Sequence, residues 1–272
     1  MTDLLALVIT VQPQESASVP GHLGRAVHAQ LLRWLDAADS SLAQHWHDTD
    51  GPKPYTCSTL VGARRNTPNV RQIQPDRTYW FRLTAFDPAV VAVLEKLLAD
   101  PPAAAELENV SLPVVGITAD PEKHPWAGQT MFEEIAAPYL LARQQSPRRL
   151  KLQFASPTGF RHNDMTMAVP LPSLVFGGLA DRWNAFSPIG VSPEVRAYSD
   201  ASVAMTNYRL HSQAIPQKAG AAQIGAVGEA GYVAVRYDRY WMAVLGLLAD
   251  FAFYGGVGRG TTTGLGQVRR LE

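Results

Sequence analysis

The stretch YWMAVLGLLADFAFYGGVGRGTTTGLGQVRRL, residues Tyr240–Leu271, joins an apolar helix pattern to a glycine-rich loop and a short final strand. In the loop, two Gly-apolar-Gly triplets are separated by five residues, one of which is Arg259. Glycine has no Cβ and adopts positive φ readily, so its amides can approach a phosphate closely, and an arginine adds a fixed charge with donors suited to phosphate oxygens. The loop therefore predicts a polyanion-binding site, and a glycine-rich turn without a ligand is the alternative interpretation.

The common nucleotide-binding glycine motifs do not fit this loop. A P-loop follows a strand and ends in Gly-Lys-Ser/Thr, and the dinucleotide fingerprint needs a third glycine where Thr261 stands. The loop also follows the predicted C-terminus of a helix, where the helix dipole is unfavourable for an anion. A phosphate bound here must therefore be held by backbone amides and by Arg259.

The chain shows two successive sets of elements in the order β-α-β-β-α-β. In the first half, hydrophobic periodicity predicts strands and helices, the first helix being long or broken. These strands cover 4–11, 55–61, 78–86 and 110–117, and the helices cover 21–47 and 88–98. In the second half, strands are predicted at 150–155, 203–211, 232–237 and 267–271, and helices at 172–185 and 240–253, after a bridging helix at 132–141.

This order is that of the ferredoxin-like fold, which RNA-recognition modules also adopt. We therefore predict an α+β protein of two tandem ferredoxin-like (RRM-like) units, residues 1–145 and residues 146–272. The halves share no obvious sequence identity, so the repeat is one of topology. Residues 187–200 fit none of these patterns.

Composition indicates an ordinary globular protein with localised positive charge. The 24 Lys and Arg residues balance 24 Asp and Glu residues, so the basic surplus typical of nucleic-acid binders is absent from the chain as a whole. Basic residues do cluster, at Arg143, Arg148, Arg149 and Lys151 in mid-chain and at Arg259, Arg269 and Arg270 near the C-terminus. The single cysteine, Cys57, excludes an internal disulfide framework and favours a cytoplasmic location. No apolar stretch is long enough to span a membrane, and the start lacks the basic region of a signal peptide.

The glycine loop, with its preceding helix and following strand, resembles the signature of the CRISPR repeat-processing endoribonucleases of the RAMP superfamily, the sixth CRISPR-associated protein family. Four other stretches are similar to that family: GRAVHAQLL at 24–32, LAQHWH at 42–47, KPYTCS at 53–58 and FASPTGF at 154–160. The resemblance implies a metal-independent endoribonuclease that cuts precursor CRISPR RNA within its repeats. It also implies RNA binding in the cleft between the two units, and it calls for no cofactor or metal.

His45, His47 and Lys53 are the candidate catalytic residues. RNA carries its own nucleophile in the 2′-OH, so cleavage needs a base for that hydroxyl, an acid for the leaving 5′-oxygen and positive charge near the phosphate. Histidines near their ordinary pKa and a nearby lysine meet these needs. The resemblance implies that His47 is the main catalytic residue and that His45 and Lys53 assist it. Both histidines can face one site only if the chain is extended there, because residues two apart on a helix point away from each other.

The resemblance also assigns the RNA contacts to the glycine loop. The residues concerned are Gly256, Gly258, Arg259, Gly260, Thr261, Gly264, Gly266 and Arg269. CRISPR repeat RNA is the expected partner, and other subunits of a CRISPR complex or a second copy of the chain are further candidates.

Two other functions compete with the endoribonuclease. An inactive RNA-binding subunit of the same superfamily would keep the glycine loop but would not need His47 and Lys53. A metal-dependent hydrolase could use the His-x-His segment. However, Thr49 and Asp50 break the register of the H-x-H-x-D-H motif, and no later ligand set has suitable spacing.

Overall fold

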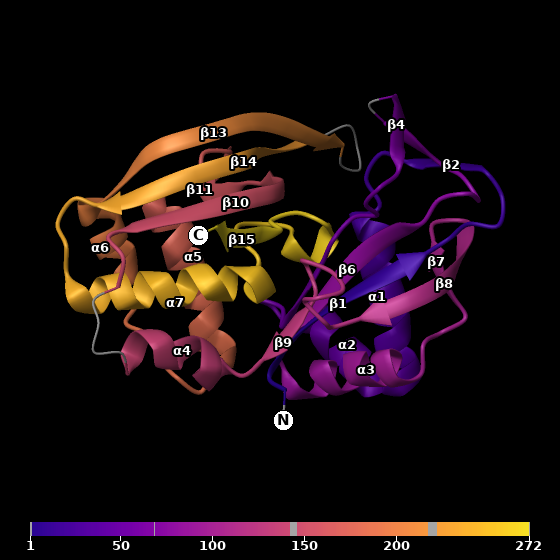
Figure 1. Ribbon diagram of the computed structural model, residues 1–272, viewed down its shortest axis with the longest axis horizontal. Coiled ribbons are helices and arrows are strands. Elements are labelled where there is room, and N and C mark those ends of the chain that lie inside the picture. The colour runs from indigo at the N-terminus through magenta and orange to yellow at the C-terminus, as the bar shows by residue number, and fades with distance from the viewer. Residues whose placement is uncertain (1, 68, 142–145, 217–221, 272) are drawn as a thin grey trace. The chain divides into compact units, whose positions relative to one another are not determined.

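The computed structural model describes residues 2–67, 69–141, 146–216 and 222–271, without the side chains of His47 and Arg65. Contacts divide the chain into an N-terminal unit, Met1–Thr130 with Thr262–Gly264, and a C-terminal unit, Met131–Thr261 with Leu265–Glu272. The sequence predicts a boundary between residues 145 and 146, and residue 145 lies outside the described part of the chain. Figure 1 labels most of the helices and strands of each unit.

The N-terminal unit contains an antiparallel sheet in the order β3-β6-β1-β8-β7, with β9 paired to β1. Its strands are β1 (Leu4–Val11), β3 (Tyr55–Cys57), β6 (Tyr79–Ala85), β7 (Ala104–Leu107), β8 (Val110–Thr118) and β9 (Gly128–Thr130). Its helices are α1 (Gly24–Ala38), α2 (Ser40–Asp48) and α3 (Pro88–Ala99). A second, small sheet has the order β2-β5-β4 and consists of Ala17–Pro20, Val70–Ile73 and Arg64–Thr67.

The core of this unit lies between the main sheet and its helices. Leu5, Leu7 and Ile9 of β1 are fully buried and belong to the same apolar cluster as Leu31 of α1 and Leu94 of α3. Alternate residues of β1 face the helices because successive side chains of a strand point to opposite faces. The main sheet is thereby fixed against α1 and α3.

The predicted first helix is two helices. Asp39 has extended backbone, with φ −162° and ψ 108°, and its carboxylate accepts hydrogen bonds from the amides of Ser41 and Leu42. An aspartate in this position satisfies amides at the start of a helix that would otherwise have no partner. Asp39 therefore ends α1 and begins α2.

The C-terminal unit contains an antiparallel sheet in the order β13-β14-β10-β15. These strands are β10 (Arg149–Thr158), β13 (Val203–Pro216), β14 (Ala222–Ala234) and β15 (Val268–Leu271). The helices are α4 (Phe132–Leu140), α5 (Pro172–Phe186), α6 (Val195–Ser202) and α7 (Arg239–Gly255). A short hairpin, β11 (Phe160–His162) and β12 (Met165–Met167), also belongs to this unit. A 3-10 turn, η2 (Thr261–Thr263), begins at its last residue before the segment Thr262–Gly264 of the N-terminal unit.

The helices of this unit cover one face of its sheet (Figure 1). Trp183 of α5 is fully buried and makes edge contacts with Phe132 of α4 and Phe251 of α7, each with ring centroids 5.2 Å apart. Aromatic pairs favour this edge-to-face arrangement. The apolar residues that the sequence shows in α7 thus pack in the core of this unit.

In each main sheet, the four strands of the β-α-β-β-α-β repeat lie in the order of the ferredoxin-like fold: β8-β1-β6-β3 in the N-terminal unit and β15-β10-β14-β13 in the C-terminal unit. The predicted α+β class and tandem ferredoxin-like architecture are confirmed. The predicted strand at 232–237 is wrong in its bounds, because β14 starts at Ala222 and ends at Ala234. Among the described residues, no helix is long and apolar enough to cross a membrane.

Candidate functional site

His45 and His47 both lie within α2, which continues to Asp48. The extended backbone that would place them on one face is therefore not present. The imidazole of His45 is exposed and makes an edge contact with the ring of Trp46, with centroids 4.7 Å apart. The side chain of His47 lies outside the described part of the structure.

Lys53 is bound to the C-terminal end of α2. Its half-buried side chain donates from Nζ to the carbonyl oxygen of Trp46 at 2.5 Å and to that of Thr49. The last carbonyls of a helix lack partners within the helix and carry partial negative charge, so a lysine there is stabilising. Lys53 therefore fixes the end of the helix that carries the two histidines.

The glycine loop of the C-terminal unit is held together by its own backbone. Val257 donates its amide to Gly266 at 2.9 Å, and Gly266 donates to Pro157 at 3.1 Å. The amide of Arg259 donates to the carbonyl of Gly159 at 2.9 Å. Because these three amides already donate to backbone carbonyls within the fold, they are not available to bind a phosphate.

The predicted RNA-binding residues of the loop differ in exposure. Gly256, Thr261, Gly264 and Gly266 are buried, and Gly258 and Gly260 are half-buried. Arg259 is exposed. Gly258 has φ +76°, and a Cβ there would lie 2.4 Å from the carbonyl oxygen of Gly159. The loop glycines thus allow close backbone packing, and Arg259 is the group that can reach a ligand.

The tip of the loop, Thr262–Gly264, belongs to the N-terminal unit. Gly264 forms a parallel bridge with Ser58, just after β3. A Cβ on Gly24, at the start of α1, would lie 2.0 Å from the carbonyl oxygen of Thr263. Close packing on the N-terminal unit therefore explains why glycine occupies both Gly24 and Gly264.

His22 contacts this loop tip and was not among the residues that the sequence indicated. Its Nε2 lies 2.8 Å from the carbonyl oxygen of Thr263. A carbonyl can only accept, so Nε2 carries the proton and, in the neutral ring, Nδ1 has the lone pair. Burial lowers the pKa of His22 below its ordinary value, Arg71 and Arg25 lower it further, and the hydrogen bond to Thr263 opposes them.

His22 is therefore an uncharged imidazole with a basic nitrogen at neutral pH. The sequence signal for it is weak, because the contact that defines it joins residues 241 positions apart. Among the described residues, no three His, Cys, Asp or Glu side chains form a group that could hold a metal ion.

Two family models match the chain. The model for the CRISPR Cas6 N-terminal domain matches residues 4–137, and the model for the CRISPR-associated endoribonuclease Cas6 matches residues 152–268. The chain belongs to the Cas6 family. As a Cas6 protein it binds and cleaves RNA and acts in the processing of CRISPR repeat RNA, which confirms the resemblance seen in the sequence.

Solved Cas6 structures resemble this chain over its whole length. The product complex of a Cas6 of Thermus thermophilus is 26% identical, covers 100% of both chains and has a TM-score of 0.81. The product complex of a second Cas6 is 25% identical, again over 100% of both chains, with a TM-score of 0.77. A Cas6-related protein of Pyrococcus furiosus shares the fold at 12% identity, covering 99% of each chain with a TM-score of 0.62. No curated protein matches the chain.

Proposed function

We propose that this Cas6 protein cleaves precursor CRISPR RNA within its repeats without a metal ion, by attack of a 2′-OH on the adjacent phosphate. A base takes the 2′-OH proton as the bond from the 2′-oxygen to phosphorus forms. The bond from phosphorus to the 5′-oxygen breaks, and an acid gives that oxygen a proton. The products are a 5′-hydroxyl end and a 2′,3′-cyclic phosphate.

The observation that carries this proposal is the histidine-bearing end of α2, which Lys53 holds in place through the carbonyl oxygens of Trp46 and Thr49. We assign proton transfer to His47, with His45 as the alternative. Lys53 positions the helix end and adds positive charge near it. This charge would stabilise the developing phosphorane.

His22 is a second group suited to proton transfer. Its lowered pKa keeps it neutral at physiological pH, and a neutral imidazole with a lone pair on Nδ1 is a base. We therefore propose His22 as a candidate base and His47 as the acid. General acid–base cleavage requires one group that accepts a proton and another that donates one.

In this proposal, RNA binding depends on the positive charge of two arginines and on the shape of the glycine loop. Arg259 is exposed at the loop, and Arg269 of β15 donates from Nε to the Gln153 side chain at 2.7 Å, which fixes its direction. The loop glycines permit the packing that places Arg259. CRISPR repeat RNA is the proposed partner, with other subunits of a CRISPR complex or a second copy of this chain as further partners.

The test is single-turnover cleavage of repeat RNA in excess EDTA by the wild type and by His47→Ala, His45→Ala and His22→Ala. Loss of a general acid or base should slow cleavage by about 10²- to 10⁴-fold with little change in RNA affinity. Normal cleavage by His47→Ala would remove that residue from the chemistry. Loss of wild-type activity in EDTA, restored by a divalent cation, would contradict the metal-free mechanism.

The proposed RNA contact of Arg259 is tested by measuring RNA affinity as a function of salt concentration. Arg259→Ala should weaken binding and lower the salt slope by about 0.7 to 0.9, the value for one phosphate contact. Arg196→Ala is the matched control, because Arg196 is an exposed arginine of α6 that is paired with Asp181. Equal salt slopes for the wild type and Arg259→Ala would place Arg259 outside the RNA site.

A further inference from the structure

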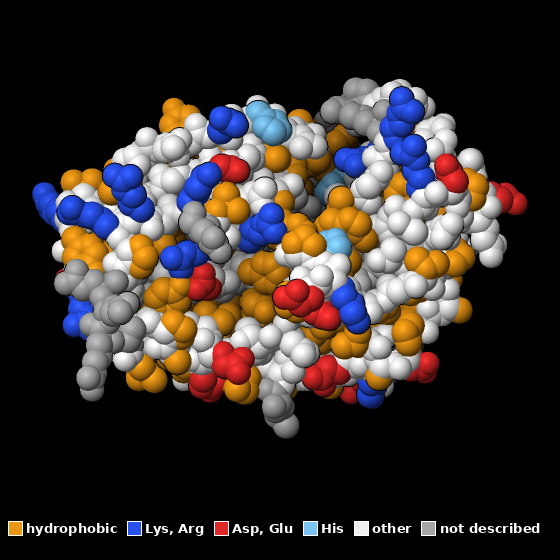
Figure 2. Space-filling model, in the orientation of Figure 1, with side chains coloured by type: hydrophobic (Ala, Val, Ile, Leu, Met, Phe, Trp, Pro, Cys, Tyr) orange, Lys and Arg blue, Asp and Glu red, His pale blue; other side chains and the backbone are white. Residues whose placement is uncertain are grey.

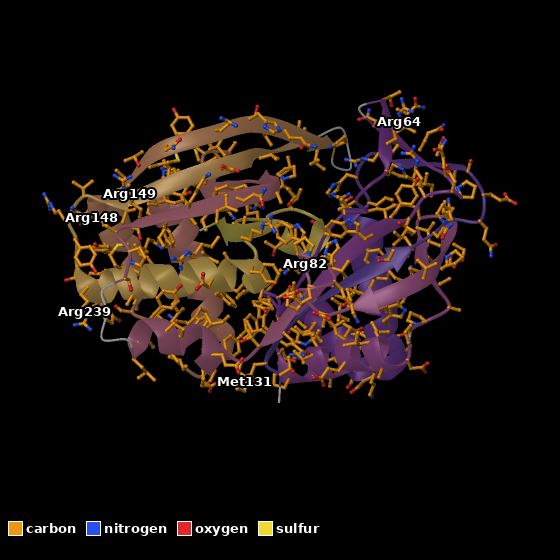
Figure 3. All side chains as sticks on the ribbon, viewed as in Figure 1. Arg64, Arg82, Met131, Arg148, Arg149 and Arg239 are labelled. Atoms are coloured by element: carbon orange, nitrogen blue, oxygen red, sulfur yellow. The ribbon has the colours of Figure 1, made fainter. Side chains whose placement is uncertain are left out.

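One face of the C-terminal sheet does not pack on the helices. In β10, Leu150, Leu152 and Phe154 are buried toward the helices, so the residues between them point to the other face, which we call the outer face. Arg149 and Lys151 are exposed on that face. Figure 3 shows Arg149 at the beginning of β10.

Strand pairing brings further cations to the outer face. Gln153 lies opposite Arg269 of β15 on one side and opposite Glu229 of β14 on the other, and Glu229 lies opposite Arg209 of β13. Residues paired across strands share a face, so Arg209 and Arg269 join Arg149 and Lys151. Across β10, β13, β14 and β15, Glu229 is the single acidic residue. Figure 2 shows several Lys and Arg side chains over these strands.

This concentration of charge is notable because the protein as a whole has a formal net charge of zero. A local excess of positive charge attracts a polyanion even when the total charge is balanced. The outer face therefore has the electrostatic character of a phosphate-binding surface.

A hollow of about 300 Å³ is lined by two of these cations, Arg149 and Lys151. Gly231 lies directly between Lys151 of β10 and Asn207 of β13 in the strand register. Arg149, Lys151, Thr206, Asn207 and Val233 are among the residues that line the hollow. With Arg270 of β15, the lining thus combines three cations with an amide and a hydroxyl group.

The backbone does not require a glycine at this position. Gly231 is not among the glycines with positive φ, and a Cβ there would meet only Asn207, at 3.4 Å from its carbonyl oxygen and 3.6 Å from its Cβ. These are ordinary van der Waals contacts. The missing side chain therefore leaves an open hollow and does not relieve a clash, unlike Gly258 in the loop.

We propose that the outer face binds a single-stranded segment of the precursor RNA, with phosphates on Arg149, Lys151 and Arg269 and one base in the hollow over Gly231. This inference rests on the RNA-cleaving function of the chain. Outward residues of one strand are about 6.8 Å apart, since each residue rises about 3.4 Å, so a file of cations follows an extended backbone. The base must be unpaired, because a base inside a duplex cannot enter a hollow in a protein surface.

The bound base would be recognised weakly. Asn207 and Thr206 offer donors and acceptors for a base edge, and the cations bind every phosphate alike. The surface therefore suits RNA that flanks the repeat and varies in sequence.

The experiment compares a minimal repeat RNA with the same RNA carrying a short single-stranded extension at either end, by fluorescence anisotropy over a range of salt concentrations. We expect the extension to tighten binding to the wild type. The double variant Arg149→Gln with Lys151→Gln should lose that gain, and its salt slope should fall by about 1.4, or about 0.7 for each phosphate contact on a single strand. Arg196→Gln on α6 is the matched control and should bind as the wild type does.

Gly231→Ala and Gly231→Val test the hollow separately from the charge. They fill it progressively, so affinity for the extended RNA should fall stepwise while the salt slope stays at the wild-type value. Circular dichroism and melting temperature should show both variants to be folded, because a strand accepts either residue better than glycine.

The outcomes separate this inference from the cleavage mechanism. If the wild type cleaves the minimal repeat but the outer-face variants bind extended RNA as tightly as it does, the outer face is not an RNA surface. If the variants lose binding to another CRISPR-complex subunit and keep RNA affinity, the face binds protein and the proposal is wrong. Failure of the wild type to cleave in EDTA bears on the metal-free mechanism alone.

Discussion

The two main sheets have the same topology, but their outer faces, which point away from the helices, differ: one is buried and the other carries exposed charge. In the N-terminal sheet, Val8 and Thr84 are fully buried and Arg82 is 2% exposed, although all three point away from α1 and α3. In the C-terminal sheet, the corresponding face carries exposed Arg149 and Lys151. Figure 3 labels Arg82 and Arg149 in the two sheets.

The chain between β8 and β9 explains part of this difference. Arg82 donates from Nε to the carbonyl oxygen of Trp126 at 2.7 Å, and its guanidinium lies 5.4 Å from the Trp126 ring. His124 likewise contacts the ring of Trp80, with centroids 4.5 Å apart. A sheet face covered in this way cannot receive a ligand. The same fold thus places the proposed chemistry of the N-terminal unit at a helix end and at a loop, and leaves the C-terminal sheet available for binding.

The largest expected effect comes from placing one charge on each outer face. Val8→Lys should destabilise the protein by about 3 to 5 kcal/mol, because it buries an unpaired charge beside Arg82. Val233→Lys, on the outer face of the C-terminal sheet, should cost less than about 1 kcal/mol, the range for a half-exposed strand position. Chemical denaturation of both variants measures the two costs.

A less disruptive substitution at the same position keeps the comparison testable if Val8→Lys does not fold. Val8→Thr keeps the shape of the side chain and buries a hydroxyl, at a cost of about 1 to 3 kcal/mol. The matched Val233→Thr should be neutral. Equal costs at the two positions would mean that the two outer faces do not differ in the way described.

The second prediction compares two glycines of the C-terminal unit. Gly258→Ala should cost about 1 to 3 kcal/mol, because the new methyl group meets the Gly159 carbonyl oxygen at 2.4 Å and the backbone has φ +76°. RNA affinity should fall with it, since Arg259 follows directly. Gly231→Ala should leave the melting temperature unchanged or raise it. A stable Gly258→Ala variant with normal RNA binding would show that the loop does not need its present backbone.

The sequence predicted the regular elements well and the local exceptions poorly. Helix 88–98 and strand 78–86 were found because their apolar periodicity continues for several residues, and the structure has Pro88–Ala99 and Tyr79–Ala85. The strands of the small β2-β5-β4 sheet were missed, because each has four residues and β4 reads Arg-Arg-Asn-Thr. Helix α6 was missed because it has only eight residues and Val195 is its single aliphatic residue larger than alanine.

The candidate site residues also divide into those that a local sequence motif predicts and those that it does not. The glycine loop and the histidines of α2 can be found by motif, because each lies within a few neighbouring residues. His22 could not be found, since its partner, Thr263, lies at the other end of the chain. Nor does the sequence reveal that Lys53 binds the C-terminal end of α2, because its partners there are backbone carbonyls and not side chains.

The third prediction concerns pH and His22. Its pKa is lowered in the folded protein, first by burial and then by Arg71 and Arg25, so the unfolded chain binds the proton more readily. Stability should therefore fall as the pH drops from about 6.5, the ordinary value, through the folded pKa. His22→Gln can keep a hydrogen bond to Thr263 but cannot titrate, so its stability should depend less on pH. Denaturant unfolding between about pH 5 and pH 8 measures this, and identical slopes for the two proteins would contradict the assignment.

The smallest expected effect is at Glu229, the single acid of the outer-face strands. Its carboxylate pairs with Lys151 Nζ at 2.5 Å, and that hydrogen bond lowers the pKa of the carboxyl group, so the group stays ionised at neutral pH. An exposed pair of this kind adds little to stability, so Glu229→Gln should melt as the wild type does. It should, however, bind extended RNA more tightly, because Lys151 loses its competing partner and the face loses its negative charge. The salt slope should stay near the wild-type value, because Lys151 and Arg149 make the same phosphate contacts in both proteins. If affinity falls instead, Glu229 orients Lys151 toward the RNA and does not compete with it, and the contrast between the two sheets then depends on an ion pair as well as on open positive charge.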